Sequence, residues 1–398
     1  MTHSDLHAAC TRRSARNPPR VLAVGSAAFL LLGIVLVLVG ANQAAMARDL
    51  GMDLAASGFL GASLALGLGV GVTSSGPLVD RFPRRPLFAG ASAMTALALL
   101  TVEPGMGYGR AVAHVAVIGA GCGFYDTLLN AAALDRWRER SAGALAFLHA
   151  AATAGAVAGP PLVAWSTEGG SWAASFHGLG WLFAGLAVWA AAVPLPGSGS
   201  DAARPSGGAP PPARGSLLAP ALLALGAIAF AYVGIENGLT LFAVPWATAG
   251  LGEDEAAGRA GISVLWFGLL LGRLALVPQR RPLGAGLLAL CGFAGAAVVC
   301  AGTLFEVRSL ALVLGLAGLA LGPVYPVMIS LAGRRFPHAA GTAAGLVGGA
   351  GALGGFFLPW ITGVVGDVAG IVTAVTLLGA WSLLIGVSAL ALWRRRRP

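Results

Sequence analysis

The sequence contains no lysine, and only 10% of its 398 residues carry a charge. Hydrophobic residues make up 57% of the chain, and the mean hydropathy is +0.80. So few charged residues cannot cover the surface of a soluble globule of this length. The composition therefore excludes an ordinary soluble domain and predicts a protein embedded in lipid.

The motifs of several enzyme classes are also missing. The four cysteines, Cys10, Cys122, Cys291 and Cys300, show neither metal-ligand nor disulfide spacing. The chain has no phosphate-binding glycine loop, no cluster of metal ligands and no nucleophile paired with a base. These absences argue against an enzyme, and we expect no catalytic residues, no metal site and no cofactor.

Long apolar runs recur along the whole chain. A helix of about 20 residues spans about 30 Å of hydrocarbon, and backbone polar groups in lipid must be satisfied within their own segment. The sequence therefore predicts an all-α membrane protein with twelve transmembrane helices. These cover residues 21–42, 55–79, 86–102, 111–133, 143–165, 172–193, 217–247, 260–277, 283–303, 309–331, 341–364 and 370–393.

The placement of arginine predicts the orientation of these helices. If both termini are cytoplasmic, 20 of the 25 arginines lie on that side, four lie on the opposite side, and Arg273 lies within a helix. This bias follows the positive-inside rule for a multi-pass protein of the cell membrane. Contact with anionic lipid headgroups then explains the net charge of +9, so nucleic acid is not an expected partner.

A segment rich in proline, glycine and serine divides the helices into six and six. Its composition predicts a flexible cytoplasmic linker. The expected order is a cytoplasmic tail (1–20), a six-helix bundle (21–193), the linker (194–216), a second six-helix bundle (217–393) and a basic cytoplasmic tail (394–398).

The two halves also repeat each other. Gly155 and Gly354 lie at matching positions, as do Gly119 and Gly318. Chance explains any single pair in a chain with 60 glycines, but recurrence at several matching places favours a duplicated six-helix unit. Such halves surround an axis along the membrane normal, with the substrate between them.

A cluster of charges separates the second and third expected helices. It reads Gly76-Pro77-Leu78-Val79-Asp80-Arg81-Phe82-Pro83-Arg84-Arg85. This cluster resembles the loop signature of the major facilitator superfamily, except that Pro83 stands where a second glycine is usual. The resemblance implies a transporter of two pseudo-symmetric six-helix bundles. We expect these residues to control the change of conformation. The expected gating residues are Gly76, Asp80, Arg81, Arg84, Arg85 and, as their counterpart in the second half, Arg273. The alternative is that the charges simply anchor the loop at the membrane surface.

Three ionisable side chains, Asp126, Glu236 and Arg273, lie well inside the expected helices. Each costs about 2.5–3.5 kcal/mol at a helix centre, so each needs a partner, a water-filled cavity or a functional reason. Asp126 and Asn130 are four residues apart and share a helix face, which we expect to line a central cavity. There Asp126 could exchange a proton near neutral pH and couple transport to protons. The alternative is a neutral Asp126 that hydrogen-bonds between helices.

The spacing of Tyr232, Glu236 and Thr240 predicts a second polar stripe, and Gly234 and Gly238 could unwind its helix. A structural role near the outer surface is the alternative for Glu236. Prolines flank one further aromatic residue, Tyr325, and are expected to kink its helix. From the residues alone the candidate substrate-binding side chains are Asn130, His149, Tyr232, Glu236, Asn237, Trp266 and Tyr325, with packing as the alternative for the rings.

Short segments around these residues resemble the fucose permease branch of the superfamily. They are Gly121–Asn130, Tyr232–Glu236, Trp266–Arg273 and Gly322–Pro326. The resemblance implies a sugar-like substrate and proton symport, with Asp126 matching a carboxylate of the branch. It also adds Asn42 as a substrate-binding candidate, since the branch's helix 1 carboxylate falls near this residue.

A competing resemblance lies in Gly155-Ala156-Val157-Ala158-Gly159-Pro160. It is similar to part of the helix 5 motif of proton-driven drug antiporters, so efflux of drugs or lipophilic metabolites is the alternative function. A receptor or scaffold on the same fold is a third. The first half places no arginine or lysine deep in the membrane to hold an anion, which favours an uncharged polar solute. The expected partners are this small molecule, protons and the lipid bilayer, with the protein acting as a monomer.

Overall fold

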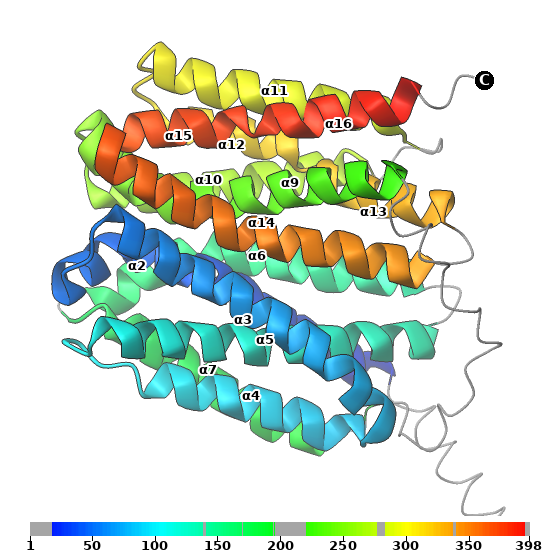
Figure 1. Ribbon diagram of the computed structural model, residues 1–398. Coiled ribbons are helices and arrows are strands. Elements are labelled where there is room, and N and C mark those ends of the chain that lie inside the picture. The colour runs from blue at the N-terminus through cyan, green and yellow to red at the C-terminus, as the bar shows by residue number, and fades with distance from the viewer. Residues whose placement is uncertain are drawn as a thin grey trace, which may run out of the picture.

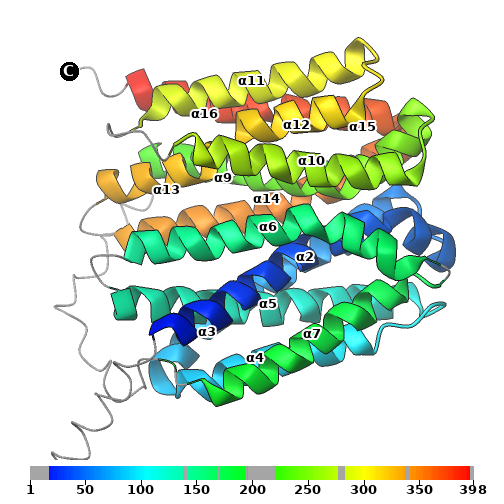
Figure 2. The same cartoon turned by 180° about the vertical axis from the view of Figure 1, so that it is seen from behind.

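The computed structural model describes residues 18–137, 141–168, 170–193, 195, 220–276, 283–336 and 340–394. These residues form helices and no strand, arranged as two bundles side by side (Figure 1), and Figure 2 shows the same two layers from behind. The first bundle contains α2 (Pro18–Leu50), α3 (Leu54–Arg81), α4 (Arg84–Leu100), α5 (Tyr108–Trp137), α6 (Ser141–Thr167) and α7 (Ala173–Ala192). The second contains α9 (Pro220–Pro245), the π-helical η2 (Trp246–Gly250), α10 (Glu255–Leu274), α11 (Ala285–Leu304), α12 (Leu310–Leu321), α13 (Val324–Arg335), α14 (Ala340–Ala369), α15 (Ile371–Ala380) and α16 (Ser382–Arg394).

The predicted number of membrane passes is confirmed for the described residues. Eleven helical stretches are long and apolar enough to cross a membrane, and the remaining pass is α4, with 17 residues. Three of the eleven join two consecutive elements: α9 with η2, α12 with α13, and α15 with α16. The predicted tails and the linker at 194–216 lie almost entirely outside the described residues.

A proline interrupts the transmembrane helix that contains Tyr325, where the sequence predicts a kink. Pro323 has no N–H and its ring clashes with the preceding turn, so α12 gives way to α13 at Gly322-Pro323. The expectation that Gly234 and Gly238 unwind their helix is wrong. Helix α9 continues through both glycines, because α14 and α15 pack directly against them.

The two bundles use the same helix pairings, as the repeated glycines predict. Helix α2 packs on α6 and α3 on α5 in the first bundle, and α9 packs on α14 and α10 on α12 in the second. A Cβ added at Gly155 would lie 2.0 Å from the carbonyl oxygen of Leu30, and one at Gly354 would lie 1.9 Å from that of Phe230. Glycine therefore allows the backbones of each pair to touch, at matching places in both bundles.

The two ends of the molecule differ in charge. The basic end, at the right in Figure 1, holds the turn between α3 and α4 and the last turn of α13, with Arg81, Arg84, Arg85, Arg334 and Arg335. The acidic end is the opposite one. Its carboxylates are Asp49, Asp53, Glu103, Glu168, Glu253, Asp254, Glu255, Glu306 and Asp367.

The bundles meet along α3 and α14, α6 and α10, and α2 and α9. At the acidic end they are joined by hydrogen bonds from the N–H groups of Leu54 and Ala55 to Asp367. Nearer to the basic end, His149 of α6 and Tyr325 of α13 are exposed. The bundles are therefore joined at the acidic end, and these two exposed side chains lie on the basic side of that contact.

Candidate functional site

Arg273 of α10 joins the two bundles through its guanidinium group. Its Nη1 donates to the Thr153 hydroxyl of α6, and its Nη2 donates to the Tyr232 hydroxyl of α9, each at 2.9 Å. The carboxylate of Glu236 lies 3.6 Å from Nη2. Thr153 and Tyr232 are near the middle of their helices. The structure therefore places Arg273 with two predicted substrate-binding residues, and its role as the second-half counterpart of the gating loop stays a prediction.

Arg273 and Glu236 offset each other's charge. Their side chains are 26% and 14% exposed, so water screens the two charges only in part. The Oε2 atom of Glu236, which is the oxygen paired with Arg273 at 3.6 Å, is buried and accepts no hydrogen bond. Because a buried acceptor without a donor costs free energy, this oxygen can be stabilised by a donor from a bound solute.

Asp126 faces a different situation in the first bundle. The amide of Asn130 donates to its Oδ1 at 3.2 Å, as the four-residue spacing predicts. Among the described residues, Asp126 takes part in no ion pair. The Oδ1 of Asn130 is buried and has no donor. A negative charge on Asp126 would thus be stabilised by the hydrogen bond from a neutral amide, without a positively charged partner among the described residues.

Tyr325 links the charges of the two bundles. Its ring lies 6.0 Å from that of Tyr232, centroid to centroid. It interacts electrostatically with Asp126 of the first bundle and with Glu236 and Arg273 of the second. We group these residues under one name, the central cluster: Asp126, Asn130, His149, Thr153, Tyr232, Glu236, Arg273 and Tyr325.

His149 and Thr153 occupy one face of α6. The Thr153 hydroxyl donates to the backbone oxygen of His149 at 3.0 Å, which leaves its lone pairs for Arg273. The His149 ring packs edge-on against Phe29, with centroids 5.1 Å apart. Thr153 was not among the predicted site residues, because a single threonine in a membrane helix carries no pattern that identifies a partner in another bundle.

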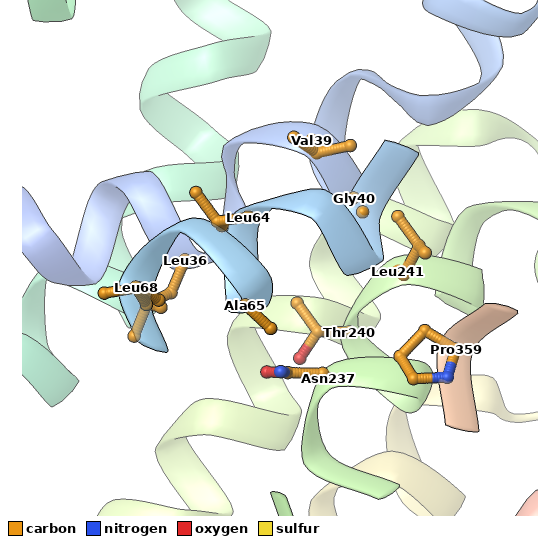
Figure 3. A pocket seen from close by; sticks show the side chains of 11 residues that line it. Leu36, Val39, Gly40, Leu64, Ala65, Leu68, Asn237, Thr240, Leu241 and Pro359 are labelled. Atoms are coloured by element: carbon orange, nitrogen blue, oxygen red, sulfur yellow. The ribbon is translucent and has the colours of Figure 1, made fainter. Parts of the chain in front are cut away.

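A small cavity lies between the bundles on the acidic side of the central cluster (Figure 3). Its volume of about 30 Å³ can hold a water molecule and is far below the roughly 300 Å³ of small ligand pockets. Asn237 and Thr240 supply its polar lining. Trp266 donates to the Thr240 hydroxyl at 3.1 Å and is buried. The Trp266 ring therefore packs inside the second bundle, and stacking on a solute would require it to move.

Asn42 is placed within the first bundle. Its amide donates to the Leu38 carbonyl and to the Ser175 hydroxyl, both at 2.9 Å, and its side chain is 3% exposed. The bond to Ser175 ties α2 to α7, whereas the bond to Leu38 lies within α2. A substrate-binding role for Asn42 would require the bond to Ser175 to break.

The predicted gating loop lies at the basic end. Gly76 is near the end of α3, Arg81 is its last residue, and Arg84 and Arg85 begin α4. Arg84 is buried, whereas Arg81 and Arg85 are exposed. Asp80 belongs to α3, and its side chain lies outside the described part. The structure brings these residues together in one turn, and their gating role stays a prediction.

Comparison with known proteins assigns the family. The sequence model described as Major Facilitator Superfamily matches residues 23–302. The chain belongs to the major facilitator superfamily. It is a membrane transporter and not an enzyme. No curated protein matches the sequence of this facilitator.

Solved structures share the fold of this facilitator. A mutant of the nucleoside transporter NupG superposes with a TM-score of 0.74 at 14% identity, covering 94% of this chain and 99% of that one. A bacterial homologue of the human lysosomal transporter Spinster, inward-facing and unoccupied, gives 0.72 at 15% identity, covering 95% and 98%. At these identities the likeness establishes the fold alone.

The segment that resembles the antiporter motif packs helices in this facilitator. Gly155 rests on the backbone of Leu30, and a Cβ at Gly159 would lie 2.4 Å from Val37 of α2. Both contacts are within the first bundle. The motif therefore has a packing role that does not distinguish import from export. Within the described residues, no group of three or more His, Cys, Asp or Glu side chains is placed to hold a metal ion.

Proposed function

We propose that this facilitator is a proton-coupled transporter that moves a small uncharged polar solute, such as a sugar, across the cell membrane by alternating access. The charge balance of the central cluster carries this proposal. Glu236 offsets Arg273, whereas Asp126 is bonded to a neutral amide. Protonation of Asp126 removes the remaining uncompensated charge, so a proton-loaded cluster is neutral and is less costly to enclose between the bundles.

The same balance favours an uncharged solute. An anion at Arg273 would have to displace the Glu236 carboxylate, which would leave that carboxylate buried without its counter-charge. The buried acceptors Asn130 Oδ1 and Glu236 Oε2 both lack donors, and solute hydroxyl groups supply them. A neutral solute with several hydroxyl groups, some facing each bundle, fits these requirements. Asn237, on the lining of the small cavity, is a further polar group for such a solute.

We place the basic end and both termini in the cytoplasm, following the positive-inside rule. In this orientation the described conformation is closed to the outside. The solute reaches the central cluster from the cytoplasm past His149 and Tyr325. The Spinster homologue with a TM-score of 0.72 is likewise described as inward-facing.

The test uses purified protein in two steps. Thermal unfolding is first measured with sugars, organic acids and lipophilic cations, because a ligand stabilises the folded state that binds it. We expect sugars or related polyols to raise the unfolding midpoint. Uptake of the stabilising solute into proteoliposomes is then measured with a pH gradient, and exchange is measured without one. Asp126→Asn should lose gradient-driven uptake and keep exchange, because exchange needs no change in protonation.

Glu168→Gln is the matched control, because Glu168 is an exposed carboxylate at the acidic end. It should keep both activities. Full gradient-driven uptake by Asp126→Asn would remove Asp126 from the coupling mechanism. Stabilisation by organic acids alone would overturn the neutral solute, and stabilisation by diverse lipophilic cations would favour the alternative, proton-driven efflux.

A further inference from the structure

Asp367 of the second bundle caps a helix of the first. Its Oδ1 accepts the N–H of Leu54 at 2.9 Å, and its Oδ2 accepts the N–H of Ala55 at 2.8 Å. These residues begin α3, and the first N–H groups of a helix have no partner within the helix itself. Asp53, in the bundle of α3, caps the next N–H, that of Ala56, at 2.7 Å.

The two aspartates differ in how they depend on the contact between bundles. Helix N-termini carry partial positive charge and C-termini carry partial negative charge. Asp367 lies in the last turn of α14, where the dipole of its own helix is unfavourable, and the N-terminus of α3 offsets this. Asp53 stays with α3 wherever the second bundle moves. Only the Asp367 contact therefore requires the bundles to be together at the acidic end.

The backbones of α14 and α3 are in direct contact beside Asp367. Gly363 lies one turn earlier on α14, and a Cβ there would be 2.1 Å from the Leu54 carbonyl oxygen. The ring of Phe59 in α3 also lies 6.0 Å from that of Trp360 in α14, centroid to centroid. This packing leaves the carboxylate of Asp367 directly against the first turn of α3.

A second contact across the bundles at this end is weaker. Arg48 pairs with Glu255, but the Arg48 side chain is 66% exposed. Exposed ion pairs contribute little, because water screens them and ordering long side chains costs entropy. Asp367 is also exposed, but its helix cap fixes a short side chain with two hydrogen bonds and is the stronger of the two contacts.

We propose that Asp367 is a latch of the acidic end: its carboxylate holds that end closed by capping α3, and it must release α3 each time the end opens. When this end opens, water replaces Asp367 as the partner of both N–H groups. The carboxylate then remains at the C-terminus of α14, where the helix dipole is unfavourable for a negative charge. Asp367 therefore stabilises the closed acidic end relative to the open one. The inference rests on the alternating access of the proposed function and on no particular solute.

The test measures the distance between the bundles at the acidic end. Spin labels are attached at Glu103→Cys and Arg308→Cys, which are exposed positions in loops of the first and second bundle. The background protein has its four native cysteines replaced by alanine. Pulsed electron spin resonance in lipid nanodiscs then gives the ratio of the long, open distance to the short, closed distance.

Asp367→Ala should raise the open-to-closed ratio about tenfold, allowing for solvent exposure of the lost charge-assisted bonds. Asp53→Ala is the matched control. It should lower the thermal unfolding midpoint and leave the ratio unchanged, because the cap of Ala56 is the same in both states. Asp367→Asn keeps the shape of the side chain but loses one acceptor, so it should shift the ratio in the same direction as alanine.

An unchanged ratio in both Asp367 variants would overturn the latch, and so would an equal shift in Asp53→Ala. No solute is needed for this measurement. Failure of the sugar assignment would appear in the uptake experiment and would leave the distance result standing.

Discussion

Glu236→Gln should destabilise the protein, because it leaves Arg273 as an uncompensated charge between the bundles. The two groups are 3.6 Å apart. At this separation their Coulomb attraction is about 1 kcal/mol in water and about 5 kcal/mol at an effective dielectric constant of 20. Both side chains are partly exposed, so the cost lies between these limits, and we expect about 2 kcal/mol.

Thermal unfolding of purified variants in one detergent measures this cost. Arg273→Gln should lower the midpoint by a similar amount, because it leaves Glu236 without its counter-charge. The double variant carries neither lone charge. Its midpoint should therefore lie above the value obtained by adding the two single shifts, since groups that interact directly are not additive.

Additive effects would refute this reasoning. They would mean that the two side chains contribute independently and that the pair does not form the neutral unit on which the solute assignment depends. A shift in Glu236→Gln that vanished at low pH would instead support it, because the native carboxylate then loses its charge as well.

Two further predictions concern helix contacts. Thr153→Val should lower the unfolding free energy by about 1–2 kcal/mol, because Arg273 loses a hydrogen bond to the first bundle. Thr153→Ser keeps the hydroxyl and should retain most of the wild-type stability in the same thermal assay. An equal loss of stability in both variants would assign the effect to packing. Gly354→Ala should lower the unfolding free energy by about 1–3 kcal/mol, because it forces α14 away from α9. Gly348→Ala is the control on the same helix, because a Cβ there meets nothing within 4 Å, and it should be neutral or stabilising by up to about 1 kcal/mol. Similar unfolding midpoints for the two alanine variants would contradict the backbone contact.

The helices could be predicted from the sequence because each pass is a local apolar run. Even α4, with 17 residues, was predicted at 86–102 within two residues of its bounds. The pairing of helices could also be anticipated, since Gly155 and Gly354 mark the same backbone contact in each half. Both features depend on residues close together in sequence or on their repetition.

The central cluster could be predicted only in part. Asp126 and Asn130 pair as their spacing indicates, because both lie on one helix. Arg273 was predicted inside its helix, and it is the second-last residue of α10. However, the end of α10 lies beside the middle of α6 and α9, and sequence does not give the relative depth of helices. This depth brings Arg273 to Thr153 and Tyr232.

The Asp367 contact could not be predicted at all. Its partner Leu54 is 313 residues away, and the partner atom is a backbone N–H that every residue except proline carries. No residue pattern marks such a contact. Only the packing of α14 on α3 determines which carboxylate reaches which helix end.

The tight contacts of Gly155 and Gly354 lie inside the bundles, whereas the hydrogen bonds that Asp367 accepts cross between them. Inherited variation in this chain should therefore separate into two phenotypes. Changes at Gly155 or Gly354 reduce how much folded protein reaches the membrane, since small losses of stability lower abundance in cells. Changes at Asp367, which is exposed at the acidic end, should leave the amount of folded protein nearly unchanged and alter how fast each molecule works. A genetic screen that records abundance and growth separately would thus map the moving interface without any structural measurement.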